Sequence, residues 1–260
     1  MIKLPTPALI GVIHLPALPG SPAHLLPMDE IIERAIADAK TLEAAGFDAV
    51  IVENYGDAPF TRNKVPPANV AAMAIAAEHV RRAGKLSVGI NALRNDAQAA
   101  LGIAAAAGAS FVRINVHTGV CATDQGLIEG DAHETLKYRK LLGRPIAILA
   151  DVHVKHGHTL SEPDIAEAAR TTAYRGLADG LIVTGAATGR AVDPDDLRRV
   201  RQAVPDRRLF VGSGATPETV GPLLEIAGGV IVGTAIREGR EISNPIDPDA
   251  ARGVLPSSRH

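Results

Sequence analysis

Short runs of β-branched and other apolar residues recur along the chain and alternate with longer segments of helical periodicity. A short continuous apolar run bounded by glycine or polar residues is typical of a strand buried on both faces, as in a parallel sheet. Strands of this kind that alternate with helices predict parallel strands joined by helical crossovers. The candidate strands span residues 9–14, 49–53, 86–90, 111–115, 146–153, 180–183, 209–212 and 229–232.

The segments between these strands carry signals for the start and end of a helix. Asp96 precedes an alanine-rich run, and Ser161 is followed closely by carboxylates that suit a first helical turn. Gly46 and Gly108 stand where a left-handed residue would end a helix. The expected helices span residues 28–45, 69–83, 96–107, 131–142, 161–176, 193–204 and 217–226, with a short last helix after Pro245.

Eight strand and helix units in 260 residues match one (β/α)₈ TIM barrel, so we expect a single domain over residues 1–260. An open doubly wound sheet shows the same alternation. However, the first strand is not followed by a GxGxxG segment, and two glycine-rich strand ends lie close to the C-terminus. These features favour a closed barrel, and the chain contains no motif for a nucleotide cofactor.

The composition narrows the function classes. The net charge is −2 and aromatic residues make up 3% of the chain with no tryptophan, which argues against a nucleic-acid partner. Cys121 is the only cysteine, so no intrachain disulfide can form and a reducing compartment is expected. The N-terminus lacks a signal-peptide pattern, and the small apolar stretch at 99–112 is too short for a transmembrane segment. We therefore expect a cytoplasmic protein.

Two consecutive strand ends near the C-terminus have the pattern of a phosphate-binding site. In TIM barrels the loops after strands seven and eight often hold a phosphate, and glycine lets backbone amides approach the anion. Plain tight turns use the same residue types, so that alternative stays open. The candidate phosphate ligands are Gly212, Ser213, Gly214, Gly233 and Thr234, with Thr184 and Gly185 at the edge.

Polar residues follow the other candidate strands, at the end where a TIM barrel carries its active site. Because alternate strand residues share a side, Arg113 should lie with Asn115 and His117, and Asp151 with His153 and Lys155. Asp151 and His153 are the candidate proton-transfer pair, and Glu53 is a second carboxylate. Lys155 or Arg113 could stabilise negative charge that develops on an oxygen atom during the reaction. A purely structural ion pair of Arg113 with Asp151 or Glu53 is the alternative.

Further polar residues are expected at the mouth, defined here as the carboxyl end of the barrel. His14, Glu53, Asp151 and His153 could also bind a divalent metal, although no HExxH or Cys/His spacing supports one. The long segments at 53–69 and 116–131 are candidate lids or binding loops, and Arg62 and Lys64 in the first could meet an anion. The remaining mouth candidates are His14, Asn54, Asn91, Arg94, Asn115 and His117.

The chain resembles the BtpA family, also called BtpA/SgcQ. The resemblance rests on GVIHLPALPGSP, DAVIVENYGDAPF, FVRINVHTG, ADVHVKHG and VGSGATPETV, and it covers nearly the whole chain. It implies a phosphate-binding barrel similar to ribulose-phosphate-binding enzymes. One named branch is linked to photosystem I biogenesis and another to sugar utilisation, and the resemblance supplies no catalytic residues.

Together these features predict an enzyme that acts on a phosphorylated sugar or nucleoside-derived metabolite by isomerase, epimerase or lyase chemistry. Two alternatives stay open: a non-catalytic biogenesis or assembly factor of the photosystem I type, and a metal-dependent hydrolase. The expected partner is a phosphorylated small molecule. A barrel of this size is also compatible with a homo-oligomer.

Overall fold

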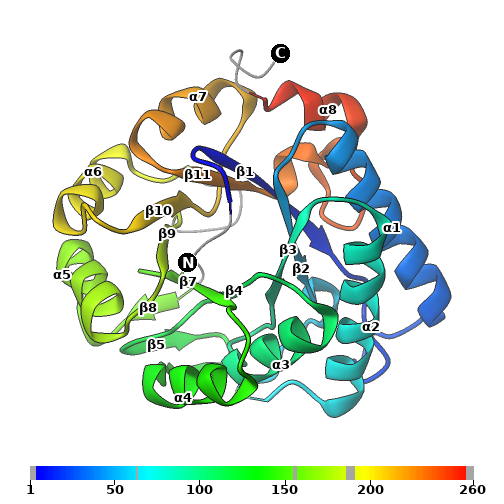
Figure 1. The fold of residues 1–260 in the computed structure, drawn as a ribbon, viewed down its shortest axis with the longest axis horizontal. Helices are drawn as coiled ribbons and strands as arrows, with labels where there is room; N and C mark the ends of the chain where they lie inside the picture. The colour runs from blue at the N-terminus through cyan, green and yellow to red at the C-terminus, as the bar shows by residue number, and fades with distance from the viewer. Residues whose placement is uncertain (1–3, 63, 155–156, 186–190, 256–260) are drawn as a thin grey trace.

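The protein folds into a closed barrel of eight parallel strands surrounded by helices (Figure 1). The structure is a computed structural model that describes residues 4–62, 64–154, 157–185 and 191–255. Around the barrel the strands follow the order β1-β11-β10-β9-β7-β4-β3-β2, which confirms the (β/α)₈ prediction. Their bounds are β1 Ala8–His14, β2 Ala49–Glu53, β3 Ser87–Asn91, β4 Phe111–Ile114, β7 Ala147–Asp151, β9 Gly180–Val183, β10 Arg208–Val211 and β11 Gly229–Val232.

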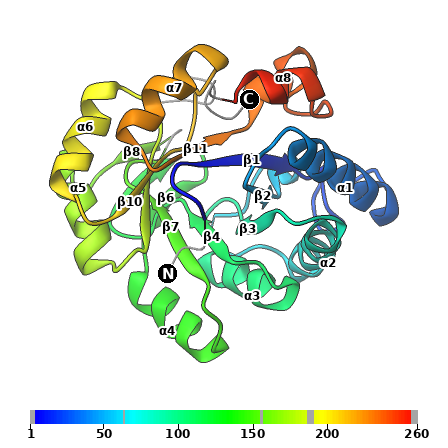
Figure 2. The same ribbon diagram turned by 45° about the horizontal axis from the view of Figure 1, so that its top comes forward.

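The helices lie outside the barrel, and Figure 2 shows the same ring from a tilted direction. Asp96 caps α3 by accepting a hydrogen bond from the amide of Ala99 at 2.9 Å, and Gly108 ends it at φ 75°, as the sequence predicts. The helix bounds are α1 Met28–Ala44, α2 Pro67–Ala83, α3 Ala97–Ala107, α4 Ala132–Leu142, α5 Ile165–Arg170, α6 Pro194–Ala203, α7 Pro217–Ile226 and α8 Pro248–Gly253. Short helical turns are η1 Tyr55–Asp57, η2 Thr171–Arg175, η3 Thr234–Ile236 and η4 Glu238–Arg240.

One predicted helix start is wrong. The helix expected from Ser161 begins at Ile165, because Asp164 caps it by accepting hydrogen bonds from the amides of Ala166 and Glu167. This helix, α5, passes directly into η2, which is a π-helix. Single π-turns within α-helices are frequent at functional sites.

A separate apolar cluster fills the inside of the barrel. Alternate strand residues point inward, so the inward positions of each strand form successive layers. Seven of the eight strands contribute to this cluster, and on these strands the next inward position beyond it belongs to the layer that forms the mouth. The cluster consists of Ala8, Ile10, Val12, Ala49, Ile51, Phe111, Ala147, Leu149, Ile182, Phe210 and Ile231.

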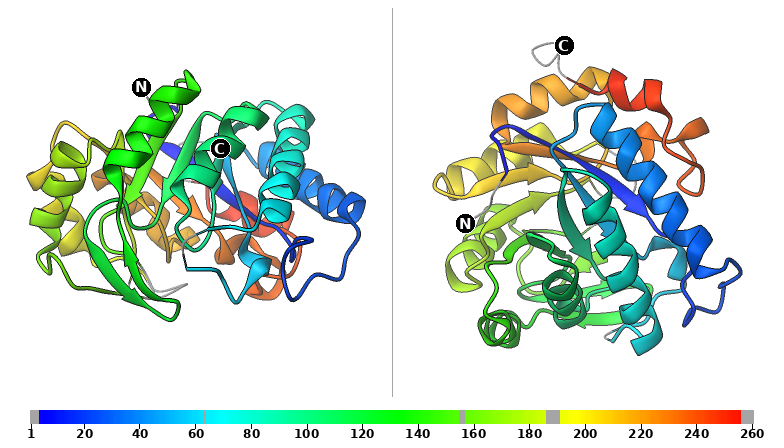
Figure 3. Two further views of the ribbon diagram at one scale, coloured as in Figure 1. Left: turned by 90° about the horizontal axis from the view of Figure 1, so that it is seen from below. Right: turned by 45° about the vertical axis from the view of Figure 1, so that its right-hand side comes forward.

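A small antiparallel sheet is attached to the mouth. The segment 116–131, expected as a loop, contains the hairpin of β5 (Val120–Thr123) and β6 (Gly126–Glu129), and β5 also pairs with β8 (Gly157–Thr159). Val116, Cys121, Ile128 and Val154 form a buried apolar cluster beneath it. In the left view of Figure 3 the green hairpin extends from the same end of the barrel as the loops that follow β1 and β2.

Within the described ranges, no helix combines the length and the apolar content that crossing a bilayer requires.

Candidate functional site

The inward positions at the end of each barrel strand, or directly after it, form a ring at the mouth. His14 pairs with Glu53 across β1 and β2, and Glu53 pairs with Asn91 across β2 and β3, so these side chains are direct neighbours. The ring has polar side chains from six strands and glycine from the other two. Its members are His14, Glu53, Asn91, Arg113, Asp151, Thr184, Gly212 and Gly233.

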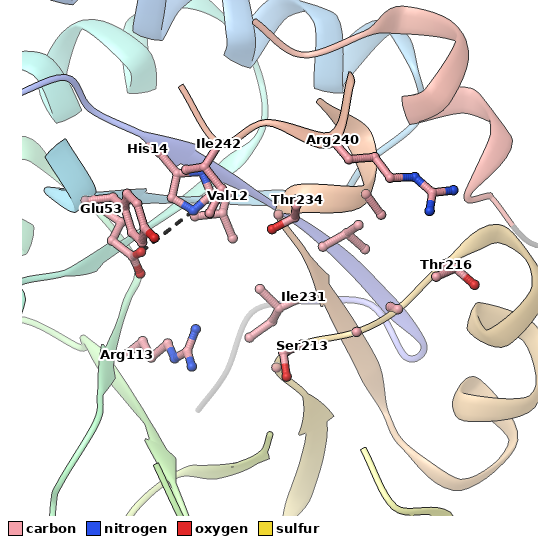
Figure 4. Close-up of a pocket in the computed structure, with 17 residues that line it drawn as sticks. Val12, His14, Glu53, Arg113, Ser213, Thr216, Ile231, Thr234, Arg240 and Ile242 are labelled. Atoms are coloured by element: carbon pink, nitrogen blue, oxygen red, sulfur yellow. Dashed lines mark ion pairs between the residues drawn. The ribbon is translucent and has the colours of Figure 1, made fainter. Parts of the chain in front are cut away.

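A cavity of about 110 Å³ lies on one side of this ring (Figure 4). It brings together most of the predicted phosphate ligands and three of the predicted polar mouth residues. Its polar and glycine lining from the predicted set is His14, Glu53, Arg113, Gly212, Ser213, Gly214, Gly233 and Thr234. Thr184 and Gly185, the two predicted edge residues, are not part of this lining.

Glycine is structurally required where β10 meets the cavity. Gly214 has φ 71°, a left-handed conformation that disfavours other residues. A Cβ at Gly212 would lie 2.5 Å from a methyl carbon of Ile182, so no larger residue fits without a shift. The hydroxyl of Ser213 accepts a hydrogen bond from the amide of Gly185 at 2.9 Å, which joins the ends of β9 and β10.

His14, Glu53 and Tyr55 form a compact polar group on the β1 and β2 side of the cavity, where His14 borders Gly233. Nε2 of His14 lies 3.8 Å from Oε1 of Glu53, and the ring of Tyr55 meets that of His14 edge to face with centroids 5.1 Å apart. Burial, and secondarily the charge of Glu53, raise the pKa of Tyr55 above its ordinary value. The Tyr55 hydroxyl is therefore protonated at neutral pH and can donate a hydrogen bond into the cavity that it lines.

Arg113 connects this group to a buried carboxylate on the far side of the ring. Its Nε and Nη2 donate to the two oxygens of Asp151 at 3.0 and 2.9 Å, and Asn115 donates to Asp151 Oδ2 at 3.0 Å. Burial opposes the charge of Arg113, but Asp151 and then Glu53 outweigh it and raise the arginine pKa. Arg113 therefore carries a fixed positive charge between two carboxylates.

The predicted pair of Asp151 and His153 is not joined by a direct hydrogen bond among the described contacts. The strand expected over 146–153 ends at Asp151, so the alternation argument does not extend to His153. Nε2 of His153 is 2.9 Å from the carbonyl oxygen of Glu162, and Thr184 donates to the carbonyl of His153. Lys155 lies outside the described residues.

The other predicted mouth residues mostly support the loops around the cavity. Asn91 donates to the carbonyl of Arg113 and to Asn115 Oδ1, which fixes the arginine strand. Asn54 bonds the amide of Leu93 and the carboxylate of Asp57.

Arg94 is buried, and its amide hydrogen-bonds the carbonyl of Thr61. His117 is buried, its Nε2 lies 2.8 Å from the carbonyl oxygen of Gly176, and burial lowers its pKa.

The four candidate metal ligands are not gathered into one site. Asp151 is engaged by Arg113 and Asn115, while His153 faces the carbonyl of Glu162. Across the part of the chain that the structure describes, no three His, Cys, Asp or Glu side chains are grouped so as to hold a metal ion.

Arg240, Tyr55 and Thr216 also line the cavity, and the sequence reasoning did not select them. Tyr55 lies in the segment 53–69, which is expected as a lid or binding loop, whereas Thr216 and Arg240 lie in connecting segments after β10 and β11. Figure 4 shows Arg240 on the same side of the cavity as Thr216 and Ser213. The sequence does contain a signal for Arg240, because two arginines follow the strand end that is predicted to bind phosphate. The nearer one, Arg237, is buried against Asp38, which leaves Arg240.

Comparison with known proteins places this architecture in a family. The BtpA family model matches residues 6–260. The chain belongs to the BtpA family. It is 47% identical over 240 residues to the photosystem I biogenesis protein BtpA of Synechocystis, covering 92% of this chain and 84% of that protein.

Solved structures show the same fold as this BtpA-family chain at low sequence identity. A native KDPGal structure has a TM-score of 0.58 at 16% identity, with coverage of 98% of this chain and 94% of that one. Phosphoribosyl anthranilate isomerase from Thermus thermophilus has a TM-score of 0.57 at 13% identity, with coverage of 95% and 96%. At such identities the likeness concerns the barrel alone.

Proposed function

We propose that this protein is an enzyme that binds a phosphorylated small molecule at the barrel mouth and moves a proton on it. The observation that carries the proposal is one cavity that joins glycine-rich strand ends to His14, Glu53 and Arg113. The glycine-rich side offers backbone amides to an anion, and the polar side offers acid, base and cationic groups. The name of the phosphoribosyl anthranilate isomerase neighbour is consistent with this substrate class.

The phosphate end is assigned to the ends of β10 and β11. Ser213 and Gly214 after β10, and Gly233 and Thr234 after β11, line the cavity together with Arg240. Arg240 adds a full positive charge to a site otherwise built from backbone and hydroxyl groups. Hydrogen bonds between charged groups are roughly twice as strong as neutral ones, so Arg240 favours a phosphate over an uncharged group.

Proton transfer is assigned to Glu53 and His14 in place of Asp151 and His153. Both residues line the cavity that holds the phosphate ligands, whereas Asp151 does not. In the proposed step, the Glu53–His14 pair takes a proton from a carbon next to a carbonyl, and the bonding electrons pass into an enolate. Arg113 stabilises the enolate oxygen. A proton passes from the hydroxyl group on the deprotonated carbon to that oxygen, and the carbon-bound proton returns to the former carbonyl carbon, so the isomerisation balances without a further reactant.

Asp151 then acts as a positioning residue. Its two hydrogen bonds to Arg113 fix the plane of the guanidinium, and the third, from Asn115, fixes Asp151 itself. A bidentate arginine–carboxylate pair has defined geometry, which suits a cation that must be aimed at one oxygen.

The test is deuterium exchange. A panel of aldose and ketose phosphates is incubated with the protein in D₂O, and loss of carbon-bound protons is followed by NMR. Glu53→Gln should lower the exchange rate by about 10² or more, the scale of acid–base catalysis, and His14→Gln should also lower it. Glu134→Gln, at an exposed position on α4, is the matched control. Exchange that persists in both mouth variants would reject the assignment.

A non-catalytic assembly role is the second candidate, and it rests on the name of the Synechocystis relative. The two proposals predict different outcomes for the same variants in a host with an assembly phenotype. If Glu53→Gln abolishes exchange but leaves assembly intact, the roles are separate. If it abolishes both, assembly depends on the chemistry of the mouth.

A further inference from the structure

The ring of Tyr55 is held by packing, whereas its hydroxyl group is left to the mouth cavity. The ring contacts those of His14 and Phe60 edge to face, with centroid distances of 5.1 and 6.3 Å. Among the residues that the structure describes, no hydrogen bond ends on the Tyr55 hydroxyl. Tyr55 lines the cavity together with Glu53 and Arg113, so this hydroxyl is available to a ligand there.

The helical turn that carries Tyr55 is fixed to its surroundings. The same turn, η1, contains Asp57, which is buried. The Asp57 carboxylate accepts three hydrogen bonds, from the amide of Leu18 at 2.8 Å and from the side-chain amides of Asn54 at 3.0 Å and Asn69 at 2.6 Å. Leu18 follows β1 and Asn69 belongs to α2, so these bonds tie η1 to two other segments. Tyr55 therefore has a defined position before a ligand binds, as orientation in catalysis requires.

The proposed isomerisation moves a second proton. Besides the proton that leaves one carbon and returns to the next, a proton passes between the oxygens of those two carbons. A group that assists this transfer must donate to one oxygen and accept from the other. An arginine only donates and an ionised carboxylate only accepts, whereas a tyrosine hydroxyl does both. Tyr55 is thus suited to this transfer, and Arg113 and Glu53 are not.

The remaining polar groups of the lining are assigned elsewhere in the proposed reaction. His14 lies 3.8 Å from Glu53 and belongs to the pair that takes the carbon-bound proton. The other hydroxyl groups follow β10 and β11, on the side of the proposed phosphate ligands, and are those of Ser213, Thr216 and Thr234. Tyr55 supplies the hydroxyl group on the side where proton transfer is proposed.

We propose that Tyr55 is a catalytic residue that relays the oxygen-bound proton, so that the enzyme is an isomerase of α-hydroxycarbonyl phosphates rather than an epimerase. The proposal rests on the proposed function, because it needs the enolate that Glu53 and His14 form. Epimerisation at the deprotonated carbon needs no such relay, since the carbonyl group stays where it is.

The relay balances without a further reactant. Tyr55 donates its proton to the enolate oxygen and receives the proton of the neighbouring hydroxyl group. The electron pair left on that second oxygen forms the new carbonyl group, and its carbon is oxidised. The former carbonyl carbon is reduced when it receives the carbon-bound proton. Tyr55 ends the reaction protonated, as it began.

The surroundings of Tyr55 favour donation and acceptance in one step. Burial, and then the charge of Glu53, raise the pKa of Tyr55, so a free phenolate is disfavoured. When the hydroxyl group gives one proton and takes another together, no phenolate accumulates. The same effect disfavours Tyr55 as the base that takes the carbon-bound proton.

Exchange and conversion, measured on the same samples, separate the two proton transfers. Ribulose 5-phosphate, fructose 6-phosphate and dihydroxyacetone phosphate are incubated in D₂O, and NMR follows both the loss of carbon-bound protons and the formation of the aldose. Tyr55→Phe still allows the enolate to form, so exchange should stay within about tenfold of the wild type, the scale of one neutral hydrogen bond. Conversion should fall by about 10² or more, the scale of acid–base catalysis.

Tyr174→Phe is the matched control, because Tyr174 is exposed and its hydroxyl donates to Asp206 outside the cavity. Both of its rates should equal those of the wild type. Tyr55→Phe keeps the ring contacts and removes no described hydrogen bond, so its unfolding in urea should also match the wild type.

The outcomes distinguish the relay from the proposed function. Equal losses of exchange and conversion in Tyr55→Phe, or conversion within tenfold of the wild type, would overturn the relay. Exchange without conversion in the wild type would also overturn the relay and would leave the proposed function standing. Absence of exchange in the wild type with all three probes would reject the proposed function itself, and the relay with it.

Discussion

The two sides of the mouth are built in different ways. On the β10 and β11 side, small residues and short turns present backbone groups, and the exposed Arg240 supplies a charge. On the β4 and β7 side, Arg113 and Asp151 form a pair whose side chains are 3% and 0% exposed, and the small sheet lies over a separate cavity beside it. A substitution of Arg240 can therefore change the affinity for an anion with little effect on folding. Loss of Arg113 or Asp151, in contrast, leaves a buried charge unpaired.

The largest expected effect follows from breaking the buried pair. Asp151→Ala leaves the charge of Arg113 buried without its partner, and we expect the free energy of unfolding to fall by about 3–5 kcal/mol. Urea denaturation measures it. The matched control is Asp195→Ala, which breaks an ion pair with Arg198 whose side chains are 81% and 56% exposed and should cost less than about 1 kcal/mol. Equal losses in the two variants would remove the distinction between the sides.

A smaller effect, on affinity alone, is expected at Arg240. Arg240→Gln removes the charge at the phosphate side, and affinity for ribose 5-phosphate should fall about tenfold or more, since hydrogen bonds to charged groups contribute about 1.5–3 kcal/mol. The free energy of unfolding should change by less than about 0.5 kcal/mol because the side chain is on the surface. Titration calorimetry and urea denaturation together check both statements.

The control for Arg240 is Arg252→Gln on α8, which loses an exposed ion pair with Asp249 and should not alter ligand binding. An Arg240 variant that binds ribose 5-phosphate like the wild type would contradict the assignment of the phosphate end.

The smallest effect concerns pH and the β4 side. Burial lowers the pKa of His117 in the folded protein, so below about pH 6.5 the unfolded chain binds a proton that the folded chain does not. The free energy of unfolding is therefore unaffected by this group above pH 6.5 and falls as the pH is lowered further. The contribution of His117 to this fall is at most about 1.4 kcal/mol per pH unit. His117→Gln should flatten the slope measured by urea denaturation, whereas His133→Gln, at a side chain that is 83% exposed, should leave it unchanged.

The barrel could be predicted from the sequence because each of its strands is a short apolar run buried on both faces. Runs such as Ala49–Glu53 and Gly229–Val232 keep nearly the bounds that the apolar pattern assigns them. The small sheet could not be predicted in this way. β5, β6 and β8 have four, four and three residues, and only two of these eleven residues are buried. The pairing of β5 with β8 also joins segments far apart in the chain.

The candidate site could be predicted only in part, because the strand pattern shows which residues point inward but not which of them are in contact. Alternation along a strand identifies Arg113 and Asp151 as inward residues and offers Asp151 or Glu53 as the ion-pair partner of Arg113. The structure shows the pair with Asp151, and the sequence does not decide between the two because that contact depends on how neighbouring strands are staggered. The proton-transfer role first assigned to Asp151 and His153 stays untested as a prediction, and the geometry favours His14 and Glu53. Arg240 was missed because its place depends on the path of the chain after β11.

The ring at the mouth has a consequence for how this family could diversify. Each strand contributes one ring position, and each position stands on an apolar layer that belongs to the barrel interior. An exchange at a ring position other than the glycines and the Arg113–Asp151 pair leaves that layer intact, so such positions, and the reaction with them, can change in evolution while the barrel is retained. Relatives that share the barrel but differ at these eight positions would then be expected to have diverged in chemistry, and a comparison of those positions alone would sort them.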